Sequence, residues 1–407
     1  MVVSAADAGS AQAPHLVING WFWGRADTGS GQYLYGLLRH LPRALPGWRL
    51  TLVLPPAADA EPEPDLPPGV EGVRTGLPVY ARGARLIKLA WEQQIFSQMC
   101  ARLSADVAFV PYWGSPLRSP CPTVVTIHDL IPLLLEDYAT KPTARAYTWL
   151  VSRSARRAAA ILAVSRSARD DIVRHLAIPP ERVHITYEGL GWPHAPVEDE
   201  VERETLRRKY ALPRRYLFYL GGFDPRKNVP LLLQSYGRAR ELAPDLPPLV
   251  VAGRLPAAGQ DWFTDPRPLL RELGLEGSVR LLGFVPNADK PGLYSMADLF
   301  IFPSRYEGFG LPVLEAMACG TPALVSDSSS LPEVVGHTLR PVPVNDVEAL
   351  AQGILAALAD PPPPQTLLAQ AARFDWESAA HRTATAIQSV YRTVPPTFKR
   401  PSHARTP

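Results

Sequence analysis

Two carboxylates in a glycine-rich segment are the residues of this sequence with the clearest chemical potential. Glu307 lies in a loop after an apolar stretch, and Glu315 follows inside a helix expected to begin near Pro312. Gly308 and Gly310 let the backbone approach a ligand, and N–H groups at the helix start can face an anion. The spacing predicts a phosphate site bordered by both carboxylates, although the helix dipole alone also favours an acidic residue at such a position.

Two adjacent cations, Arg226 and Lys227, form a second candidate site. They follow Gly221 and Gly222 and precede a helix expected from Pro230 onward. Arginine offers a bidentate fork of donors and lysine a compact charge, so the pair could neutralise a departing nucleotide diphosphate. The alternative is a pair of solvated basic residues in an exposed loop.

His128 directly follows an expected apolar strand at residues 123–127. Functional residues collect at the carboxyl ends of such strands, and a neutral imidazole can hydrogen-bond a sugar hydroxyl and titrate near neutral pH. A histidine here can equally be a polar residue satisfied within the core. The neighbouring Asp129 could orient the ring or contact a substrate.

A glycine-containing loop, with Gly29 and Gly31, precedes a helix expected over residues 31–41. A dinucleotide fingerprint would need three glycines in a tight turn and an acidic residue at the end of the second strand. Gly36 is too distant for that turn, and Leu54 is followed by two prolines. The pattern therefore argues against an NAD-dependent oxidoreductase.

The elements that must position these residues alternate between strands and helices, which predicts an α/β fold with mostly parallel sheets. The chain has 407 residues, enough for two domains. A stretch rich in Gly, Pro and Trp near residues 189–196 indicates the boundary. The expected division is a first domain at 1–190, a linker at 191–213, a second domain at 214–375, a helix at 376–394 that crosses back to the first domain, and a disordered basic tail at 395–407.

Composition excludes several classes of protein. The formal net charge is only +3, so no nucleic-acid partner is expected. Three scattered cysteines suggest neither a disulfide framework nor a zinc cluster, which is typical of a reducing cytosol. Apolar runs are too short to span a bilayer, so any membrane contact would be peripheral.

The segment from Lys141 to Arg174 carries eight cations against two aspartates, with Tyr147 and Trp149 interleaved. A solvated helix face is one explanation. A docking surface for anionic lipid, or for a lipid-diphosphate acceptor, is the other.

Several of these segments resemble glycosyltransferase family 4, a family of retaining enzymes. The resemblance is carried by Glu-Gly-Phe-Gly-Leu-Pro-Val-Leu-Glu at 307–315, Gly-Gly-x-x-x-Arg-Lys-Asn at 221–228 and His-Asp-Leu at 128–130, and it covers nearly the whole chain. It implies the GT-B fold, in which two Rossmann-like domains with parallel sheets face each other across a deep crevice.

The resemblance also implies roles for individual residues. Arg226 and Lys227 would bind the donor phosphates, Glu307 the donor sugar, and Glu315 the ribose or nearby donor hydroxyls. His128 would lie near the donor sugar and acceptor. Further donor-binding positions are expected in four places. These are the glycine loop of the first domain, the loop at 221–228 (called the phosphate loop below), the contact with the nucleotide base, and the segment at 308–311 that leads into the helix of Glu315. The residues are, in that order, Gly29 and Gly31; Gly222; Phe284 and Val285; and Gly308, Phe309, Gly310 and Leu311. Phe284 could equally belong to the core.

The implied reaction is metal-independent transfer of a sugar, mannose-type by resemblance, from a GDP- or UDP-linked donor to a glycan or lipid-linked acceptor hydroxyl. Retention by same-face substitution is favoured, since the family offers no agreed carboxylate nucleophile. No cofactor is expected beyond the nucleotide-sugar itself. A nucleotide-sugar epimerase on the same fold and a catalytically silent nucleotide-sugar-binding subunit are the alternatives.

Overall fold

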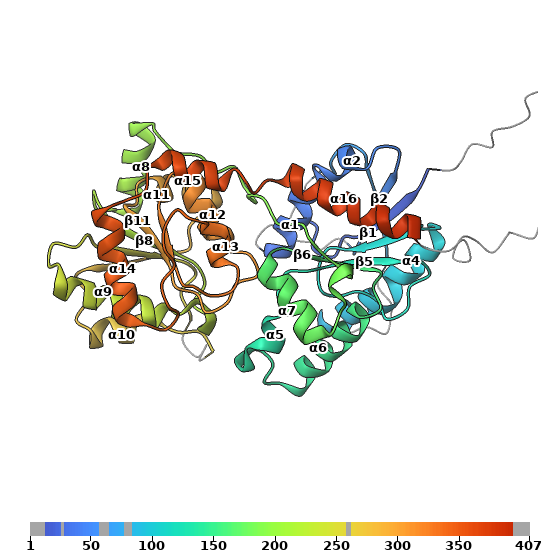
Figure 1. Ribbon diagram of the computed structural model, residues 1–407, viewed down its shortest axis with the longest axis horizontal. Helices are drawn as coiled ribbons and strands as arrows, with labels where there is room; N and C mark the ends of the chain where they lie inside the picture. The colour runs from blue at the N-terminus through green and yellow to red at the C-terminus, as the bar shows by residue number, and fades with distance from the viewer. Residues whose placement is uncertain (1–12, 26–27, 57–64, 77–83, 258–261, 394–407) are drawn as a thin grey trace, which may run out of the picture.

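The computed structural model describes residues 13–25, 28–56, 65–76, 84–257 and 262–393. Its core is two separate parallel sheets, one in each half of the chain (Figure 1). This arrangement confirms the predicted α/β class with two parallel-sheet domains. The expected tail at 395–407 lies outside the described residues.

The first sheet has seven strands in the order β3-β2-β1-β4-β5-β6-β7. All of its strand pairs are parallel, and its central strands are buried on both faces, as apolar runs in parallel sheets usually are. The strands are β1 (His15–Asn19), β2 (Arg49–Leu54), β3 (Val70–Arg74), β4 (Val107–Val110), β5 (Thr123–Ile127), β6 (Ala160–Ala163) and β7 (Val183–Ile185).

The second sheet has five parallel strands in the order β10-β9-β8-β11-β12. β11 lies between β8 and β12, so the loops that follow these three strands are neighbours at one edge of the sheet. The strands are β8 (Leu217–Leu220), β9 (Leu249–Ala252), β10 (Val279–Gly283), β11 (Leu299–Phe302) and β12 (Ala323–Val325).

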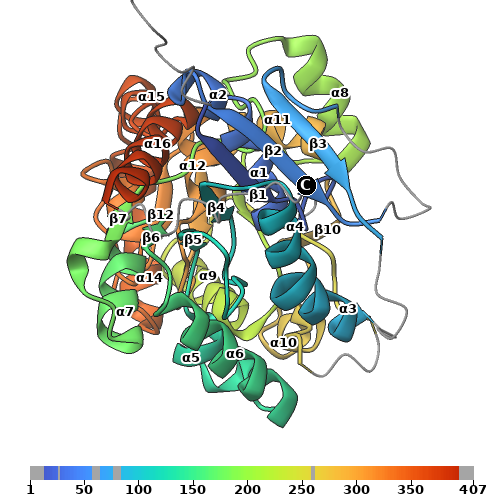
Figure 2. The same ribbon diagram turned by 90° about the vertical axis from the view of Figure 1, so that its right-hand side faces the viewer.

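Helices of the first half surround its sheet, as the end-on view in Figure 2 shows. A π-helical turn, η1 (Trp91–Ile95), interrupts the helical stretch of residues 84–102. The helices are α1 (Gly29–Leu38), α2 (Leu41–Ala44), α3 (Ala84–Ala90), α4 (Phe96–Arg102), α5 (Ile131–Leu134), α6 (Pro142–Ala155) and α7 (Arg166–Leu176), with short 3-10 turns η2 (Glu136–Tyr138) and η3 (Pro180–Arg182).

Helices of the second half begin with α8, which packs on α11 of the same half. The helical part of the expected linker therefore contacts the second domain. The helices are α8 (Glu200–Tyr210), α9 (Val229–Leu242), α10 (Pro266–Glu272), α11 (Lys290–Ser295), α12 (Leu311–Ala318), α13 (Leu331–Val335), α14 (Val347–Ala359), α15 (Pro364–Ala371) and α16 (Trp376–Thr393), with 3-10 turns η4 (Pro225–Lys227) and η5 (Asn287–Asp289).

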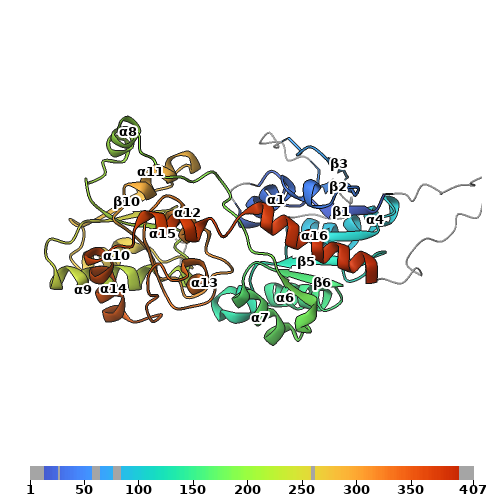
Figure 3. The same cartoon turned by 45° about the horizontal axis from the view of Figure 1, so that its top comes forward.

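α16 leaves the second half and runs along the first, where it packs on α1 and α2 (Figures 1 and 3). Its first residue anchors the crossing, because the Trp376 indole N–H donates to the Leu190 carbonyl at 2.7 Å. Gly36 and Gly189 make room for this ring, since a Cβ on either would lie within 3 Å of it.

Candidate active site

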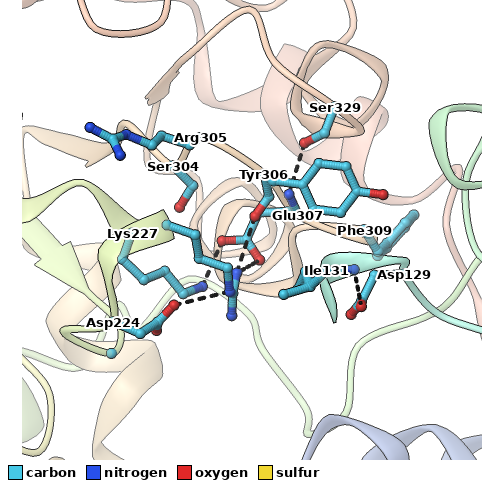
Figure 4. A network of polar contacts seen from close by, with 12 residues as sticks. Asp129, Ile131, Asp224, Lys227, Ser304, Arg305, Tyr306, Glu307, Phe309 and Ser329 are labelled. Atoms are coloured by element: carbon cyan, nitrogen blue, oxygen red, sulfur yellow. Dashed lines mark hydrogen bonds and ion pairs between the residues drawn. The ribbon is translucent and has the colours of Figure 1, made fainter. Parts of the chain in front are cut away.

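The two basic residues predicted to bind a diphosphate lie against the first signature carboxylate. Arg226 and Lys227 are in η4, within the connection that follows β8, and Glu307 is in the loop after β11. Lys227 Nζ lies 2.7 Å from Glu307 Oε1, and Arg226 Nη1 lies 2.6 Å from Oε2 (Figure 4). Arg226 Nε also lies 3.1 Å from Asp224 Oδ1. The neighbouring strands β8 and β11 thus bring these groups together at one edge of the sheet.

Burial and charge set the ionisation of this cluster. Lys227 and Glu307 are 7% and 8% exposed. Burial alone would raise the pKa of Glu307, but the charges of Lys227 and Arg226 hold it below its ordinary value. Burial and the Arg226 charge lower the pKa of Lys227 despite the nearby carboxylate. The ammonium also lies 4.6 Å from the ring centre of Phe302, a cation–π contact.

The glycine-rich loop is fixed by serines that follow β12. The Glu307 N–H donates to Ser329 Oγ at 2.8 Å. Ser330 Oγ donates to the carbonyls of Glu307 and Phe309 at 3.0 and 2.6 Å. Gly310 precedes α12 with a φ of +110°, a left-handed conformation that favours glycine. Within the described residues no side chain caps this helix, so its first N–H groups, near Leu311, remain suited to an anion.

Gly308 contacts the other half of the protein. A Cβ at this position would lie 2.2 Å from the His128 carbonyl oxygen. The Gly308 carbonyl accepts a hydrogen bond from Ser165 Oγ at 2.7 Å. We call this contact of Gly308 with His128 and Ser165 the Gly308 seam; it joins the loop after β11 to the loops after β5 and β6.

Glu315, the second signature carboxylate, has a different environment from that expected. It is buried in α12 and accepts a hydrogen bond from the Tyr294 hydroxyl at 2.9 Å. Its Oε2 lies 3.8 Å from His194 Nε2, on the segment between the two halves. Among the described residues, its polar contacts do not include Arg226, Lys227 or Glu307, so the structure does not join the two carboxylates in one cluster.

Both ring nitrogens of His128 face acceptors. Nδ1 lies 2.9 Å from Glu188 Oε1, and Nε2 lies 3.1 Å from the Pro111 carbonyl oxygen. A neutral imidazole has only one N–H and could satisfy only one of them. Burial alone would lower the pKa of His128, but the Glu188 hydrogen bond and charge outweigh it and raise the pKa above its ordinary value. The geometry favours an imidazolium over the neutral ring considered from the sequence.

The predicted donor-binding glycines differ in what they contact. Gly29 and Gly31 lie in the first turn of α1, not in the loop before it, and Thr28 caps this helix. A Cβ on Gly31 would lie 2.0 Å from the Arg25 carbonyl oxygen, whereas one on Gly29 would meet nothing within 4 Å of the described chain. Gly222 lies in the phosphate loop, where a Cβ would be 3.0 Å from Asp224 Oδ2.

The two residues expected at the nucleotide base differ in solvent exposure. Val285 is buried, whereas the Phe284 side chain is 64% exposed and does not belong to the core. The Arg254 guanidinium lies 5.6 Å from its ring centre. Phe284 therefore offers an accessible aromatic face.

Three contacts across the halves had no signal in the sequence. The Tyr138 hydroxyl donates to Asp224, which also pairs with Arg226. The Trp262 indole N–H donates to the Asp137 carbonyl at 3.2 Å, and its ring meets that of Tyr138 edge to face. Of these residues, only Asp224 lies within a motif predicted from the sequence, the one that contains Arg226 and Lys227.

The basic segment at 141–174 does not form one patch. Lys141, Arg145, Trp149 and Arg153 are exposed at helical spacing along α6, and the Trp149 side chain is 61% exposed. In contrast, Arg166 faces Glu333 of the second half. None of the residues of neighbouring α5 is buried, although its sequence is Ile-Pro-Leu-Leu.

Two other kinds of site are absent from the described part of the chain. No three His, Cys, Asp or Glu side chains there are placed to share a metal ion. No helix there is long and apolar enough to cross a bilayer.

Two family models match the chain. "Glycosyltransferase Family 4" covers residues 28–190, and "Glycosyl transferases group 1" covers residues 202–374.

Curated relatives include the O-antigen chain mannosyltransferase B of Escherichia coli, with 36% identity over 271 residues, 65% of this chain and 70% of that protein. The serotype-specific mannosyltransferase WbdA of Escherichia coli is 34% identical over 275 residues, and the match spans 64% of this chain but only 33% of that protein.

Solved structures share the fold at low identity. A sucrose-phosphate synthase from Thermosynechococcus elongatus matches with a TM-score of 0.72 at 21% identity, over 94% of this chain and all of that one. HepE of Anabaena, solved in complex with UDP, matches with a TM-score of 0.67 at 18% identity, over 92% of this chain and all of that one.

Proposed function

Because this chain belongs to the family 4, group 1 glycosyltransferases, we propose that it transfers a mannose-type hexose from a nucleotide-sugar to an acceptor hydroxyl in polysaccharide or glycolipid synthesis. The observation that carries the proposal is the cluster of Arg226, Lys227 and Glu307 at the carboxyl ends of β8 and β11. Named mannosyltransferases among the relatives support the sugar class. HepE, which shares the fold, is solved with UDP. The proposed donor of this chain is GDP- or UDP-linked.

The cluster provides cations for a departing diphosphate. In this structure both cations are paired with Glu307, so donor binding would exchange one set of acceptor oxygens for another. The diphosphate would take Arg226 and Lys227, and the freed Glu307 would accept hydrogen bonds from donor sugar hydroxyls. Preorganised positive charge in a water-poor site is commonly the largest catalytic contribution.

Retention and metal-independence are part of the same proposal. The fixed charges of Arg226, Lys227 and the start of α12 would stabilise the leaving group. Charge development on the leaving diphosphate would then assist attack from the same face of the sugar. Glu307 is assigned to positioning, because in this scheme its oxygens accept hydrogen bonds from donor sugar hydroxyls once the cations have moved to the diphosphate.

His128 contributes a positive charge beside the seam in this scheme. Its two N–H groups are directed to Glu188 and to the Pro111 carbonyl, so an acceptor hydroxyl would have to replace one of these partners. Glu315 is assigned to donor hydroxyls by resemblance; its Oε2 accepts the Tyr294 hydrogen bond, and a carboxylate has further acceptor sites for donor hydroxyls.

Phe284 would support the nucleotide base. Its ring is exposed, and the Arg254 guanidinium lies nearby. Stacking of a base on an aromatic side chain is worth about 1–3 kcal/mol. We therefore expect Phe284→Ala to weaken nucleotide binding without weakening binding of the sugar.

We also propose that α6 docks peripherally on anionic lipid. Lys141, Arg145 and Arg153 flank the exposed Trp149 on one face, and juxtamembrane cations contribute about 1 kcal/mol each. Cosedimentation with anionic and neutral vesicles tests this. Arg145→Glu should weaken binding to anionic vesicles only, whereas equal binding to both kinds of vesicle would refute the electrostatic account.

The first experiment for the enzyme is a thermal-shift panel with GDP, UDP, ADP and dTDP, each with and without Mg²⁺, and with NAD for comparison. A ligand at 100 times its dissociation constant adds about 2.7 kcal/mol to stability. Stabilisation by GDP or UDP, independent of metal, is expected. Stabilisation by NAD and by none of the nucleotides would contradict the proposal.

Turnover assays with the selected nucleotide-sugar then separate the alternatives. Transfer to an acceptor with an unchanged anomeric configuration supports the proposal. Conversion of the donor with no acceptor present would identify an epimerase, and tight donor binding without turnover would identify a binding subunit.

A further inference from the structure

A cavity lies at the junction of the two halves, on the other side of the Gly308 seam from Arg226 and Lys227. Its volume is about 580 Å³, and residues of α7, α13 and α16 line it. In Figures 1 and 3, α7 and α13 approach each other across the junction. The cavity therefore has walls from both halves of the protein.

Strand order separates this cavity from the cluster at Arg226 and Lys227. Those cations follow β8, Gly308 follows β11, and the cavity residues Ser329 and Glu333 follow β12. Since β11 lies between β8 and β12, the Gly308 seam stands between the two sites.

The charge of the cavity is predominantly positive. Arg166, Arg373 and Arg382 line it, with Glu333 as the carboxylate. Glu333 already has partners in the protein, because it accepts hydrogen bonds from the backbone N–H of Arg166 and from the Tyr187 hydroxyl, each at 2.8 Å. Arg166 Nε lies 3.5 Å from the same carboxylate.

The other two arginines have no carboxylate within ion-pair distance among the described residues. Arg373 donates to the Gln370 side-chain oxygen at 3.0 Å. The Arg382 guanidinium lies 5.1 Å from the ring centre of Tyr187. Both side chains thus line the cavity with charges that no protein anion there neutralises. Guanidinium groups bind phosphate through paired, charge-assisted hydrogen bonds.

Each of these arginines is tied to a different half. Arg382 lies on the part of α16 that packs on the first domain, against Tyr187, which follows β7. Arg373 is held by Gln370 of α15, whose amide donates to the Val334 carbonyl of α13 in the second domain. An anion bound between them would bridge the domains.

We propose that this cavity binds the phosphate group of a small phosphorylated metabolite, with Arg373 and Arg382 as its anchors, and that the bound ligand holds the two domains together. The site adjoins the one proposed for the donor through Ser329, which accepts the Glu307 N–H, but its lining does not include Arg226, Lys227 or Glu307. Occupancy favours the closed arrangement, so the phosphate compound and the nucleotide raise each other's affinity by the same factor.

The test measures binding of inorganic phosphate and of glucose 6-phosphate to the full chain by calorimetry, in a constant chloride background. The variant Arg373→Gln with Arg382→Gln should weaken both affinities about tenfold or more, as loss of charged hydrogen bonds implies. A matched double variant, Arg271→Gln with Arg392→Gln, removes two exposed arginines outside the cavity and should change neither affinity by more than about twofold. Melting temperatures without phosphate check that both variants fold.

Repeating the titration with saturating GDP or UDP distinguishes the two sites. Tighter phosphate binding in the presence of the nucleotide supports the proposal, provided that the cavity variant loses this effect. Displacement of phosphate by the nucleotide would place the ion in the donor crevice and overturn it. Equal phosphate affinity in the wild type and the cavity variant would overturn it as well. The comparison of the wild type with the cavity variant needs neither nucleotide binding nor sugar transfer, so it is independent of the proposed enzymatic function; the effect of GDP or UDP rests on that function.

Discussion

Glu92→Gln should stabilise this protein at neutral and alkaline pH. Glu92 lies in the π-helical turn η1 and is fully buried. The Tyr147 hydroxyl lies 2.9 and 3.0 Å from its two oxygens, and Lys88 Nζ lies 3.5 Å from Oε1. The buried Tyr112 also faces this carboxylate. Burial raises the pKa of Glu92 to about 7, although the Lys88 charge opposes this rise.

The sign and size of the effect follow from proton linkage. An exposed glutamate has a pKa of 4.5, so between pH 4.5 and about 7 the folded chain holds a proton that the unfolded chain has released. The free energy of unfolding therefore falls as the pH rises through this interval and is level, for this group, above it. The two pKa values correspond to a loss of about 3 kcal/mol.

Urea unfolding of both proteins at several pH values between 4.5 and 8.5 measures this. Glutamine copies the shape of the neutral carboxyl group and cannot ionise, so the variant should match the wild type near pH 4.5 and exceed it by about 3 kcal/mol above pH 7. The raised pKa of His128 also removes stability as the pH rises, but it acts equally in both proteins and cancels in their difference.

Glu272→Gln, at an exposed position, is the matched control and should show no pH-dependent difference from the wild type. A constant difference between Glu92→Gln and the wild type across the whole range would refute the reasoning. It would mean that Glu92 is ionised throughout, stabilised by Lys88 and the tyrosine hydroxyl groups.

The remaining predictions concern the donor site and the contacts between the halves. Gly308→Ala should lower kcat by about 100-fold with little change in the melting temperature. The added carbon would lie 2.2 Å from the His128 carbonyl, and a displacement of about 1 Å is enough for such a loss. Gly277→Ala, where a Cβ meets nothing within 4 Å of the described chain, should leave kcat unchanged. Lys227→Ala should lower kcat by about 10²–10³-fold in transfer assays while the fold persists, and near-normal turnover would remove this residue from the phosphate role. Tyr138→Phe deletes a hydrogen bond between the halves and should weaken their closure by about 1–2 kcal/mol, seen as a larger radius of gyration in small-angle scattering; an unchanged radius would count against this contact.

The sequence predicted the part of the site that depends on strand order. Arg226, Lys227 and Glu307 each follow a parallel strand closely, and the carboxyl ends of neighbouring strands meet at one edge. Their grouping needed no knowledge of how the domains pack. Glu315 could not be placed in this way, because its partners Tyr294 and His194 lie on another helix and on the segment between the domains.

Contacts across the halves were the least predictable from sequence. The ionisation of His128 depends on Glu188, 60 residues later in the chain. Tyr138 reaches the phosphate loop only because α5 and η2 lie at the junction of the domains. Such contacts depend on domain packing, which leaves no periodicity or spacing in the sequence. Phe284 was ambiguous for a related reason, since an aromatic residue at a strand end can lie in the core or at the surface.

Gly308 shows how a correct motif can have an incomplete physical explanation. From the sequence, the glycine was expected to let the backbone approach a ligand. In the structure Gly308 approaches the His128 carbonyl of the other domain, and the Ser165 hydroxyl donates to the Gly308 carbonyl. A side chain here would thus separate the domains before it met any donor. In our proposal the adjacent Glu307 contacts the donor sugar, so Glu307 and Gly308 together link closure of the domains to placement of the donor. Closure of the domains is therefore the reason that glycine is required at position 308.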